Sequence, residues 1–230
     1  MGEEFCALED LVILKTIAWI FDLDGTLVDS SRQIGDSINC ARKEFGYRPL
    51  PLSKVEELVG LPITHFLRDI EINKIDEKDL ISRFRQILEI EILRENHVFP
   101  GVRDFLSQLK GVGLKTAIAT SKPTYLAELV IKNSLLHGLV DVVQGTEGFP
   151  AKPDPTCILK AMLRLETEKA IMVGDRIEDI QAAIAAGIDS IGIAHSFHDK
   201  ASLQAAGAVH VFDTFLEFFQ SKESLRLLVD

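Results

Sequence analysis

Residues 21–29 read Phe21-Asp22-Leu23-Asp24-Gly25-Thr26-Leu27-Val28-Asp29, and they continue the apolar run Thr16–Phe21. A continuous apolar run of this length is typical of a strand buried on both faces of a parallel sheet. Alternate strand residues share a side, so Asp22 and Asp24 can both face the crevice beyond the strand's carboxyl end, where open α/β sheets bind ligands. Gly25 then allows a tight turn. An Asp-Gly turn without any chemistry is the alternative.

Further apolar runs follow along the chain and alternate with helical patterns. The strand candidates are Leu114–Thr120, Val140–Val143, Ala170–Val173, Ser190–Ala194 and Val209–Phe212. Helical patterns cover Asp104–Lys110, begin at Pro123 and cover Glu178–Ala186, with glycine or proline at their ends. This alternation predicts an α/β fold with a doubly wound, Rossmann-like parallel sheet that helices cover on both faces.

The segment between the first and second predicted strands has a different pattern of apolar residues. Residues 31–96 contain no convincing strand, and Ile75–Glu91 carries apolar residues at three- and four-residue spacing, as an amphipathic helix does. A connection of this length far exceeds the usual loop of a βαβ unit. We therefore expect an inserted α-helical cap domain at residues 31–96. The core domain is then built from residues 1–30 and 97–230.

The composition is that of a globular protein, with 47% apolar and 26% charged residues. Lys and Arg number 25 against 35 Asp and Glu, which gives a formal net charge of −10. Duplex nucleic acid and anionic membrane surfaces would repel such a chain, so we expect neither as a partner. A phosphorylated ligand is compatible with this charge only where the protein supplies a local cation.

Three cysteines lie far apart in the sequence, at Cys6, Cys40 and Cys157. Their spacing predicts neither a disulfide framework nor a zinc site, which favours a reducing compartment. The first residues are acidic where a secretory signal would be basic, and the apolar stretch Leu11–Phe21 is too short to span a bilayer. The expected location is therefore the cytoplasm.

A second pair of carboxylates follows a later strand. Asp175 comes at the end of the run at 170–173, and Asp179 lies one helical turn further on. Taken alone, Asp179 is also a residue that the start of a helix favours. That alternative does not explain the similar pair formed by Asp22 and Asp24. Carboxylates gathered in one crevice repel each other unless a cation joins them, and oxygen ligands favour Mg²⁺. The two segments together predict a metal site.

Two more loops could hold an anion. Thr120 and Ser121 stand where the second strand stops and a helix begins, and hydroxyls with free N–H groups at a helix start can bind phosphate. An ordinary helix cap would use the same residues. Lys152 precedes two prolines in a stiff loop. An exposed surface lysine is the usual explanation for such a residue, but here Lys152 could be the cation that a phosphate dianion needs.

In this order, the four segments resemble the haloacid dehalogenase-like superfamily, and most of all its phosphoglycolate phosphatase-like branch. The family pattern is DxDGT, a strand-end Thr or Ser, a Lys, and GDxxxD. Here it is met by Asp22–Thr26, Thr120-Ser121, Lys152 and Gly174–Asp179. The resemblance extends over essentially the whole chain, including the helical cap between the first two motifs. One departure is Arg176, where many relatives carry Ser or Thr.

The resemblance implies a Mg²⁺-dependent phosphatase that acts on a small phosphorylated metabolite: a phosphoglycolate-like compound, a sugar phosphate or a nucleotide. Asp22 would be the nucleophile and would form an aspartyl-phosphate that water hydrolyses. Asp24 would protonate the leaving alcohol and then activate the water. The implied assembly is a monomer or a homodimer.

The resemblance also implies which residues hold the ligands. Asp22, Asp175 and the backbone carbonyl of Asp24 would hold Mg²⁺. The phosphoryl group would be bound by Thr120, Ser121 and Lys152. Two residues would support the site: Asp179, by orienting Lys152 or a metal-bound water, and Gly25, at the turn.

Three alternatives to hydrolysis share this fold: dehalogenation or phosphonate cleavage, sugar phosphomutase activity as the runner-up, and catalytically silent binding. Dehalogenases and phosphonate-cleaving members of the superfamily depart at the position of Asp24, which makes both chemistries poor candidates. Sugar phosphomutases of the family carry a His in the cap shortly after the first motif, whereas no His precedes His65 here. A catalytically silent binding protein on the same fold is the third alternative. A dinucleotide-binding enzyme is excluded, because Gly111 and Gly113 precede a strand instead of following one.

Substrate choice is expected to depend on the cap, because the core contacts only the phosphoryl group. Gly60–Ile63 resembles the specificity loop of the family's caps, and His65 or Arg68 could reach the leaving group. A solvated helix face is the more common role for such residues. The other histidines have no ligand-like spacing and are expected to be incidental. They are His97, His137, His195, His198 and His210.

Overall fold

The computed structural model describes residues 17–68, 74–222 and 224 of the chain. Among them, one large sheet contains β1 (Ile17–Phe21), β4 (Thr116–Ala119), β5 (Val142–Gln144), β6 (Lys169–Gly174), β7 (Asp189–Ile193) and β8 (His210–Phe212). Its strand order is β5-β4-β1-β6-β7-β8, and all neighbouring strands are parallel. The predicted parallel α/β sheet is therefore confirmed.

The strands form where the apolar runs predict them, with ends that differ by one or two residues. The clearest difference is at residues 140–143, where the strand begins only at Val142. Asp141 precedes it, and its carboxylate accepts the backbone N–H of Thr116 at 2.8 Å, outside the ladder. Thr16, the first residue of the opening run, lies outside the described residues.

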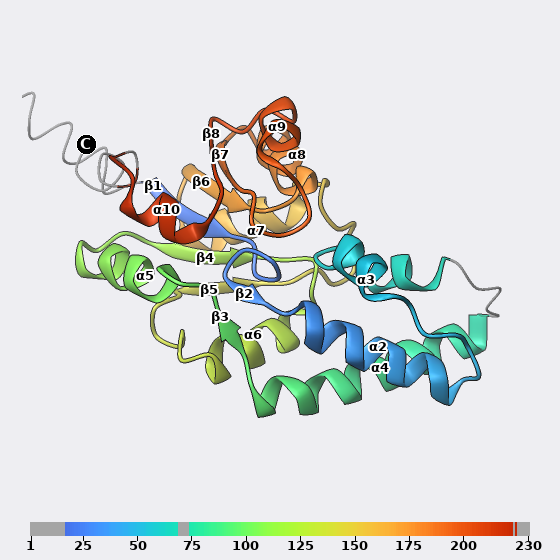
Figure 1. Ribbon diagram of the computed structural model, residues 1–230. Coiled ribbons are helices and arrows are strands. Elements are labelled where there is room, and N and C mark those ends of the chain that lie inside the picture. The colour runs from blue at the N-terminus through green and yellow to red at the C-terminus, as the bar shows by residue number, and fades with distance from the viewer. Residues whose placement is uncertain (1–16, 69–73, 223, 225–230) are drawn as a thin grey trace, which may run out of the picture.

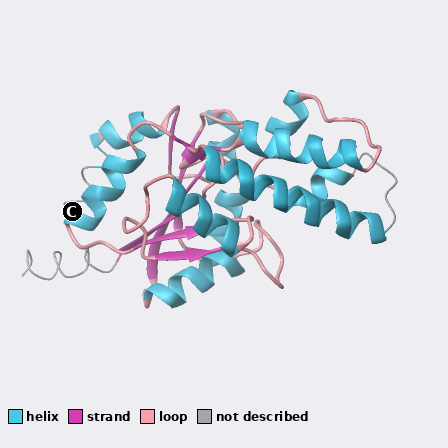
Figure 2. Ribbon diagram, turned by 90° about the horizontal axis from the view of Figure 1, so that it is seen from below, coloured by secondary structure: helices cyan, strands magenta, loops and turns pink. Residues whose placement is uncertain are grey.

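Helices cover both faces of the sheet, as Figures 1 and 2 show. Along β1, alternate side chains enter different clusters: Trp19 and Phe21 on one face, Ala18 and Ile20 on the other. The first cluster includes residues of α5 (Val102–Gly111), α6 (Thr124–Asn133) and α10 (Phe215–Gln220). The second includes residues of α7 (Thr156–Leu165) and α8 (Ile177–Ala186), while α9 (Lys200–Ala205) packs on β7 and β8.

The first cluster is rich in aromatic rings. Trp19 meets Phe105 edge to face at 5.1 Å between ring centroids, and Phe105 meets Phe218 at 5.0 Å. Such pairs add about 0.5–1.5 kcal/mol each beyond the area that they bury. This packing anchors the middle of β1, so the residues that follow it extend from a rigid support.

Residues 31–96 contain helical elements: α2 (Ser31–Glu44), α3 (Leu52–Leu58), the short 3-10 helix η1 (Ile63–Leu67) and α4 (Lys74–Arg94). The expected amphipathic helix is α4, and its buried residues recur every four positions at Leu80, Phe84, Leu88 and Ile92. Helices α2 and α4 pack against each other (Figure 1). We call this segment the cap, and its status as a separate domain stays a proposal.

The chain enters and leaves the cap through two short strands that the sequence pattern does not predict. β2 (Val28–Asp29) pairs antiparallel with β3 (His97–Val98), with Val28 opposite Val98. The amide of Asn133 on α6 also donates to the carbonyl of Ile92 on α4 at 2.6 Å. The strand pair holds the two ends of the cap side by side, and the bond from Asn133 ties α4 of the cap to α6 of the core. None of the helices described is long and apolar enough to cross a membrane.

Candidate active site

The site lies at the switch point of the sheet, where the order of the strands along the chain runs outward in both directions from β1. β1 is in the middle of the sheet, with β4 on one side and β6 on the other. Phe21, the last residue of β1, is in register with Ile118 of β4 and Val173 of β6, so the three strands end at the same level. Residues that follow these strands therefore meet at one edge, as expected for open α/β sheets.

Lys152 is buried at this edge and contacts two of the carboxylates. Its ammonium group lies 2.7 Å from Oδ1 of Asp22 and 2.5 Å from Oδ1 of Asp179, and it donates to the carbonyl of Ala119 at 2.9 Å. The residue is only 5% exposed, so the alternative of a surface lysine is wrong. Burial alone would lower the pKa of Lys152, but Asp179 and Asp22 raise it above its ordinary value and keep the group charged.

Three buried carboxylates gather around this lysine. Ligand oxygens of Asp22, Asp175 and Asp179 all lie within 4.8 Å of one another. Burial raises the pKa of Asp22 to about 7 even though Lys152 opposes the shift, and burial together with the charge of Asp22 raises the pKa of Asp175. Three carboxylates next to one ammonium group leave excess negative charge in a buried site. An oxygen-ligated divalent cation such as Mg²⁺ fits this donor set.

The turn after β1 brings backbone close to the carboxylates. Gly25 has φ +88°, and a Cβ there would come within 2.5 Å of an Asp175 carboxylate oxygen. The next residue, Thr26, donates its hydroxyl to Oδ1 of Asp175 at 2.6 Å. The sequence analysis gave Thr26 no role, although it belongs to the DxDGT motif. Thr26 therefore holds the carboxylate of Asp175, which follows the neighbouring strand β6, and Gly25 leaves room for it.

The carboxylate of Asp24 is not part of this cluster. It accepts a hydrogen bond from the ammonium group of Lys122 at 2.6 Å, and both side chains are 5% exposed. Lys122 was missed by the sequence analysis. The signal for it in the sequence is a lysine placed directly after the strand-end hydroxyls, although lysines are rarely buried.

Thr120 and Ser121 lie at the end of β4, as predicted. The Thr120 hydroxyl accepts the backbone N–H of Lys122 at 3.2 Å, and Ser121 lines the cavity described below. The N-cap of α6 is Pro123, and it makes no side-chain cap bond, so neither hydroxyl serves as the ordinary helix cap.

Asp179 combines both expected roles, because its Oδ2 accepts the N–H of Arg176 at 3.0 Å while Oδ1 holds Lys152.

Arg176, the departure from the family pattern, reaches the cap. Its side chain is buried, and Nη1 donates to the carbonyls of Glu57 at 3.1 Å and Val59 at 2.8 Å. These carbonyls lie at the end of α3, immediately before the predicted specificity loop. Arg176 thus connects the strand end that carries Asp175 with the cap.

His195, one of the histidines expected to be incidental, lies beside the turn that follows Asp24. Its Nε2 lies 2.7 Å from the carbonyl of Gly25, and the hydroxyl of Ser196 donates to the same oxygen at 2.8 Å. A carbonyl only accepts, so Nε2 carries the proton. Burial lowers the pKa of His195, which favours this neutral ring. The long sequence separation of 170 residues left no local signal for this contact.

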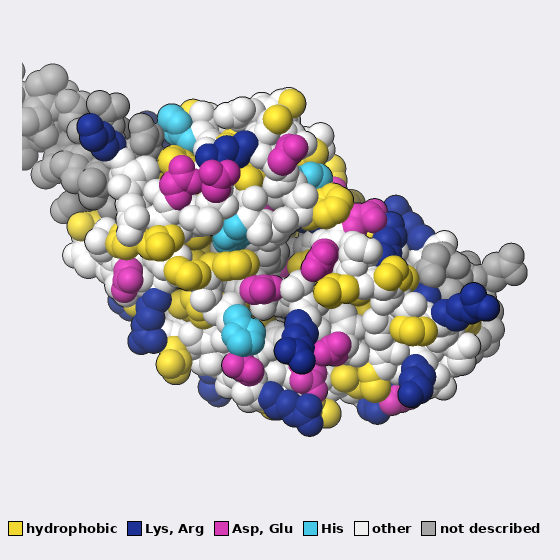
Figure 3. All heavy atoms as spheres, viewed as in Figure 1, with side chains coloured by type: hydrophobic (Ala, Val, Ile, Leu, Met, Phe, Trp, Pro, Cys, Tyr) yellow, Lys and Arg dark blue, Asp and Glu magenta, His cyan; other side chains and the backbone are white. Residues whose placement is uncertain are grey.

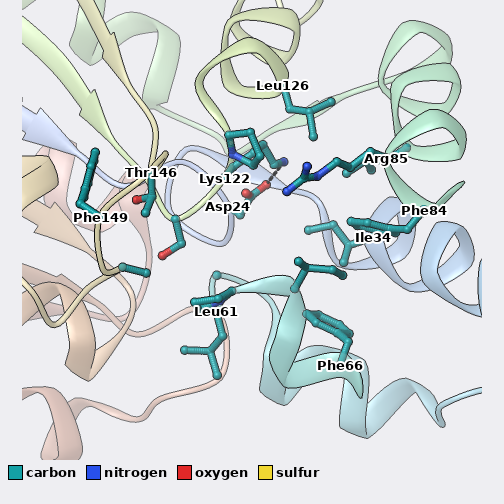
Figure 4. Close-up of a pocket in the computed structure, with 17 residues that line it drawn as sticks. Asp24, Ile34, Leu61, Phe66, Phe84, Arg85, Lys122, Leu126, Thr146 and Phe149 are labelled. Atoms are coloured by element: carbon teal, nitrogen blue, oxygen red, sulfur yellow. Dashed lines mark hydrogen bonds and ion pairs between the residues drawn. The ribbon is translucent and has the colours of Figure 1, made fainter. Parts of the chain in front are cut away.

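A cavity of about 230 Å³ opens beside Asp24, between core and cap (Figure 4). The predicted specificity loop, residues 60–63, lines it together with Ser121 and Lys122. His65 and Arg68 are not among its lining residues. Their side chains contact each other instead, with 2.7 Å between Nη2 of Arg68 and Nε2 of His65. Arg68 is exposed and His65 is half-buried, and a contact of either residue with the leaving group stays a prediction.

Comparisons with known proteins agree on one family. Residues 19–193 match the model for haloacid dehalogenase-like hydrolases. A phosphoglycolate phosphatase of Psychrobacter arcticus is 27% identical, over 85% of this chain and 91% of its own. The probable phosphatase IndB of Dickeya dadantii is 31% identical, over 90% of this chain and 93% of its own. The crystal structure of a predicted phosphatase from Clostridium acetobutylicum superposes with a TM-score of 0.81 at 29% identity, covering 92% and 99% of the two chains.

Proposed function

The chain belongs to the haloacid dehalogenase-like hydrolase family and is a phosphatase of its phosphoglycolate phosphatase-like branch, and from this premise we propose that it hydrolyses a small phosphomonoester with Mg²⁺ through an aspartyl-phosphate on Asp22. The observation that carries the proposal is the convergence of Asp22, Lys152 and Asp175 at one sheet edge. Phosphoglycolate-like compounds, sugar phosphates and nucleotides are the candidate substrates.

In the first step, a carboxylate oxygen of Asp22 attacks phosphorus while the bond to the leaving oxygen breaks. Lys152, 2.7 Å from Asp22, offsets negative charge on the transferring group and holds the nucleophile in place. Asp24, which enters this step protonated, gives its proton to the leaving oxygen and is left as the carboxylate that Lys122 holds. The cavity beside Asp24 supplies the space for that leaving group.

In the second step, Asp24 takes a proton from a water molecule, which attacks the aspartyl-phosphate and releases phosphate. One carboxylate thus acts as acid and then as base. Thr120, Ser121 and Lys152 bind the phosphoryl oxygens in this proposal. Nucleophilic attack and proton transfer need separate carboxylates in this proposal. Asp22 contacts Lys152, and Asp24 contacts Lys122.

Asp22, Asp175 and the backbone carbonyl of Asp24 are the proposed Mg²⁺ ligands, with Asp179 and Gly25 in support. The excess of buried carboxylates over ammonium groups supports this assignment. When bound, Mg²⁺ would offset charge on the transferring phosphoryl group.

The test measures phosphate release from p-nitrophenyl phosphate with Mg²⁺. We expect turnover by the wild type and none by Asp22→Asn, which keeps the side-chain shape but removes the nucleophilic carboxylate. Asp189→Asn is the control, because it removes one exposed carboxylate at the start of β7 and should leave the rate unchanged. Folding is checked by circular dichroism. No turnover by folded wild type on several phosphomonoesters, or a near-normal rate in Asp22→Asn, would refute the proposal.

A further inference from the structure

The walls of the cavity beside Asp24 are mainly apolar. The cap contributes Leu61, Phe66, Phe84 and Leu88, and the core contributes Leu126 and Phe149 (Figure 4). A sugar placed there would press its hydroxyls against side chains that cannot hydrogen-bond. An unmade hydrogen bond of a buried hydroxyl is costly, so these walls favour an apolar or aromatic leaving group.

The charged residues that line the cavity are Asp24, Lys122 and Arg85. Asp24 and Lys122 are paired with each other, and their charges offset. Arg85 is half-buried on α4, and its guanidinium points into the cavity toward that pair (Figure 4). The cavity therefore carries a net positive charge in a protein whose formal charge is −10.

Arg85 has no carboxylate partner among the described residues, in contrast to its neighbour on the same helix. Arg83 points elsewhere and binds Glu44 through two bonds of 2.6 and 2.8 Å. Glu89, one turn after Arg85, lies near Tyr125 on α6, and burial together with the charge of Glu89 raises the pKa of Tyr125. A guanidinium that faces an apolar cavity without a partner is a site for an anion from outside the chain, and a carboxylate matches its planar donors.

We propose that the leaving group of the substrate is one aromatic ring that carries a carboxylate at its far end, and that Arg85 binds this carboxylate. The inference rests on the proposed phosphatase function and names the substrate class of the same site. The phosphoryl group lies at Asp22, the bridging oxygen at Asp24, and the far end of the leaving group at Arg85. A volume of about 230 Å³ limits the body to about one aromatic ring.

The test compares kcat/KM for 4-carboxyphenyl phosphate, phenyl phosphate and glucose 6-phosphate, with Mg²⁺ present. For the wild type, we expect kcat/KM for the carboxylated ester to exceed that for phenyl phosphate by roughly ten- to a hundredfold, which is the contribution of one charged hydrogen bond. Glucose 6-phosphate should have the lowest kcat/KM of the three. The Arg85→Gln variant should lose most of this ratio, and Arg85→Lys should keep part of it. Arg83→Gln is the matched control and should keep the full ratio.

The outcomes separate this inference from the proposed function. If the wild type hydrolyses phenyl phosphate but shows no preference for the carboxylated ester, or prefers glucose 6-phosphate, the assignment of Arg85 is overturned. An unchanged ratio in Arg85→Gln, or an equal loss in Arg83→Gln, overturns it as well. If folded wild type hydrolyses none of the three esters, the phosphatase proposal itself fails and this inference falls with it.

Discussion

The ammonium group of Lys122 lies 2.6 Å from the carboxylate of Asp24, 98 residues earlier in the chain, and the pair is almost fully buried. A second buried pair joins Lys152 to Asp22 at 2.7 Å. The two carboxylates of the DxDGT motif therefore have separate lysine partners. This separation matches the separate tasks that we propose for them.

Replacing Lys122 tests the first pair. Lys122→Met keeps most of the volume but leaves the buried Asp24 without its counter-charge, so the free energy of unfolding should fall by roughly 3–5 kcal/mol. Turnover should fall as well, because Asp24 is no longer held in place. Denaturant unfolding measures the first effect, with the exposed Lys132→Met on α6 as control. Equal stability of the two variants would contradict the prediction.

The raised pKa values predict how Mg²⁺ and pH act together. Burial raises the pKa of Asp22 from 3.8 to about 7 in the metal-free protein, and that of Asp175 also rises. A carboxyl group with a higher pKa when folded binds more protons in the folded state, so the metal-free protein should lose stability as pH rises from about 4 to about 7. Mg²⁺ should offset this loss above pH 7.

Thermal unfolding with Mg²⁺ or with a chelator measures this effect. At a hundred times Kd, Mg²⁺ stabilises by about 2.7 kcal/mol, which raises Tm by roughly 5–10 °C for a chain of this size. The rise should be larger at pH 8 than at pH 5, and Asp175→Asn should reduce it, whereas Asp189→Asn should not. An equal rise at both pH values would argue against the carboxylate cluster as the metal site.

Arg176 should control the contact between core and cap. Arg176→Ser, which restores the residue type common among relatives, removes both bonds to the carbonyls of Glu57 and Val59. We expect amide hydrogen exchange to become faster at the end of α3 and in the specificity loop, while β6 stays protected. KM should rise more than kcat falls, because the loop lines the cavity for the leaving group. Unchanged exchange in this loop would show that Arg176 does not hold the cap.

His195 should position the turn that carries Asp24. His195→Ala removes one of two side-chain donors to the carbonyl of Gly25 and the ring that packs at a tilt against Phe99, with 3.8 Å between centroids. We expect kcat to fall by about tenfold, because the catalytic turn loses one hydrogen bond that holds it in place. His195→Gln can still donate and should recover part of the rate. The exposed His210→Ala is the control, and an equal kcat in both alanine variants would exclude this role.

Acidic and basic side chains are interspersed on the face of the molecule seen in Figure 3, without one large patch of a single sign. No large basic surface on that face therefore offsets the net negative charge of the chain. Positive charge is placed instead at the site, where Lys122 and Lys152 are buried and Arg85 is half-buried. For an acidic protein, this is where cations are needed to bind a phosphorylated anion.

The strands, the helices and the motif residues followed from the sequence, because periodicity, turn residues and strand-end carboxylates are local features. Strand register then brought Asp22, Thr120 and Asp175 to one edge, as expected for parallel strands. Only the tertiary structure separated Asp24 from Asp22, buried Lys122, and brought His195 and Arg176 to their backbone carbonyls. These contacts join segments about 100 or more residues apart and use residue types that are usually exposed. Their positions depend on how segments that are distant in the sequence pack together, which no local pattern records.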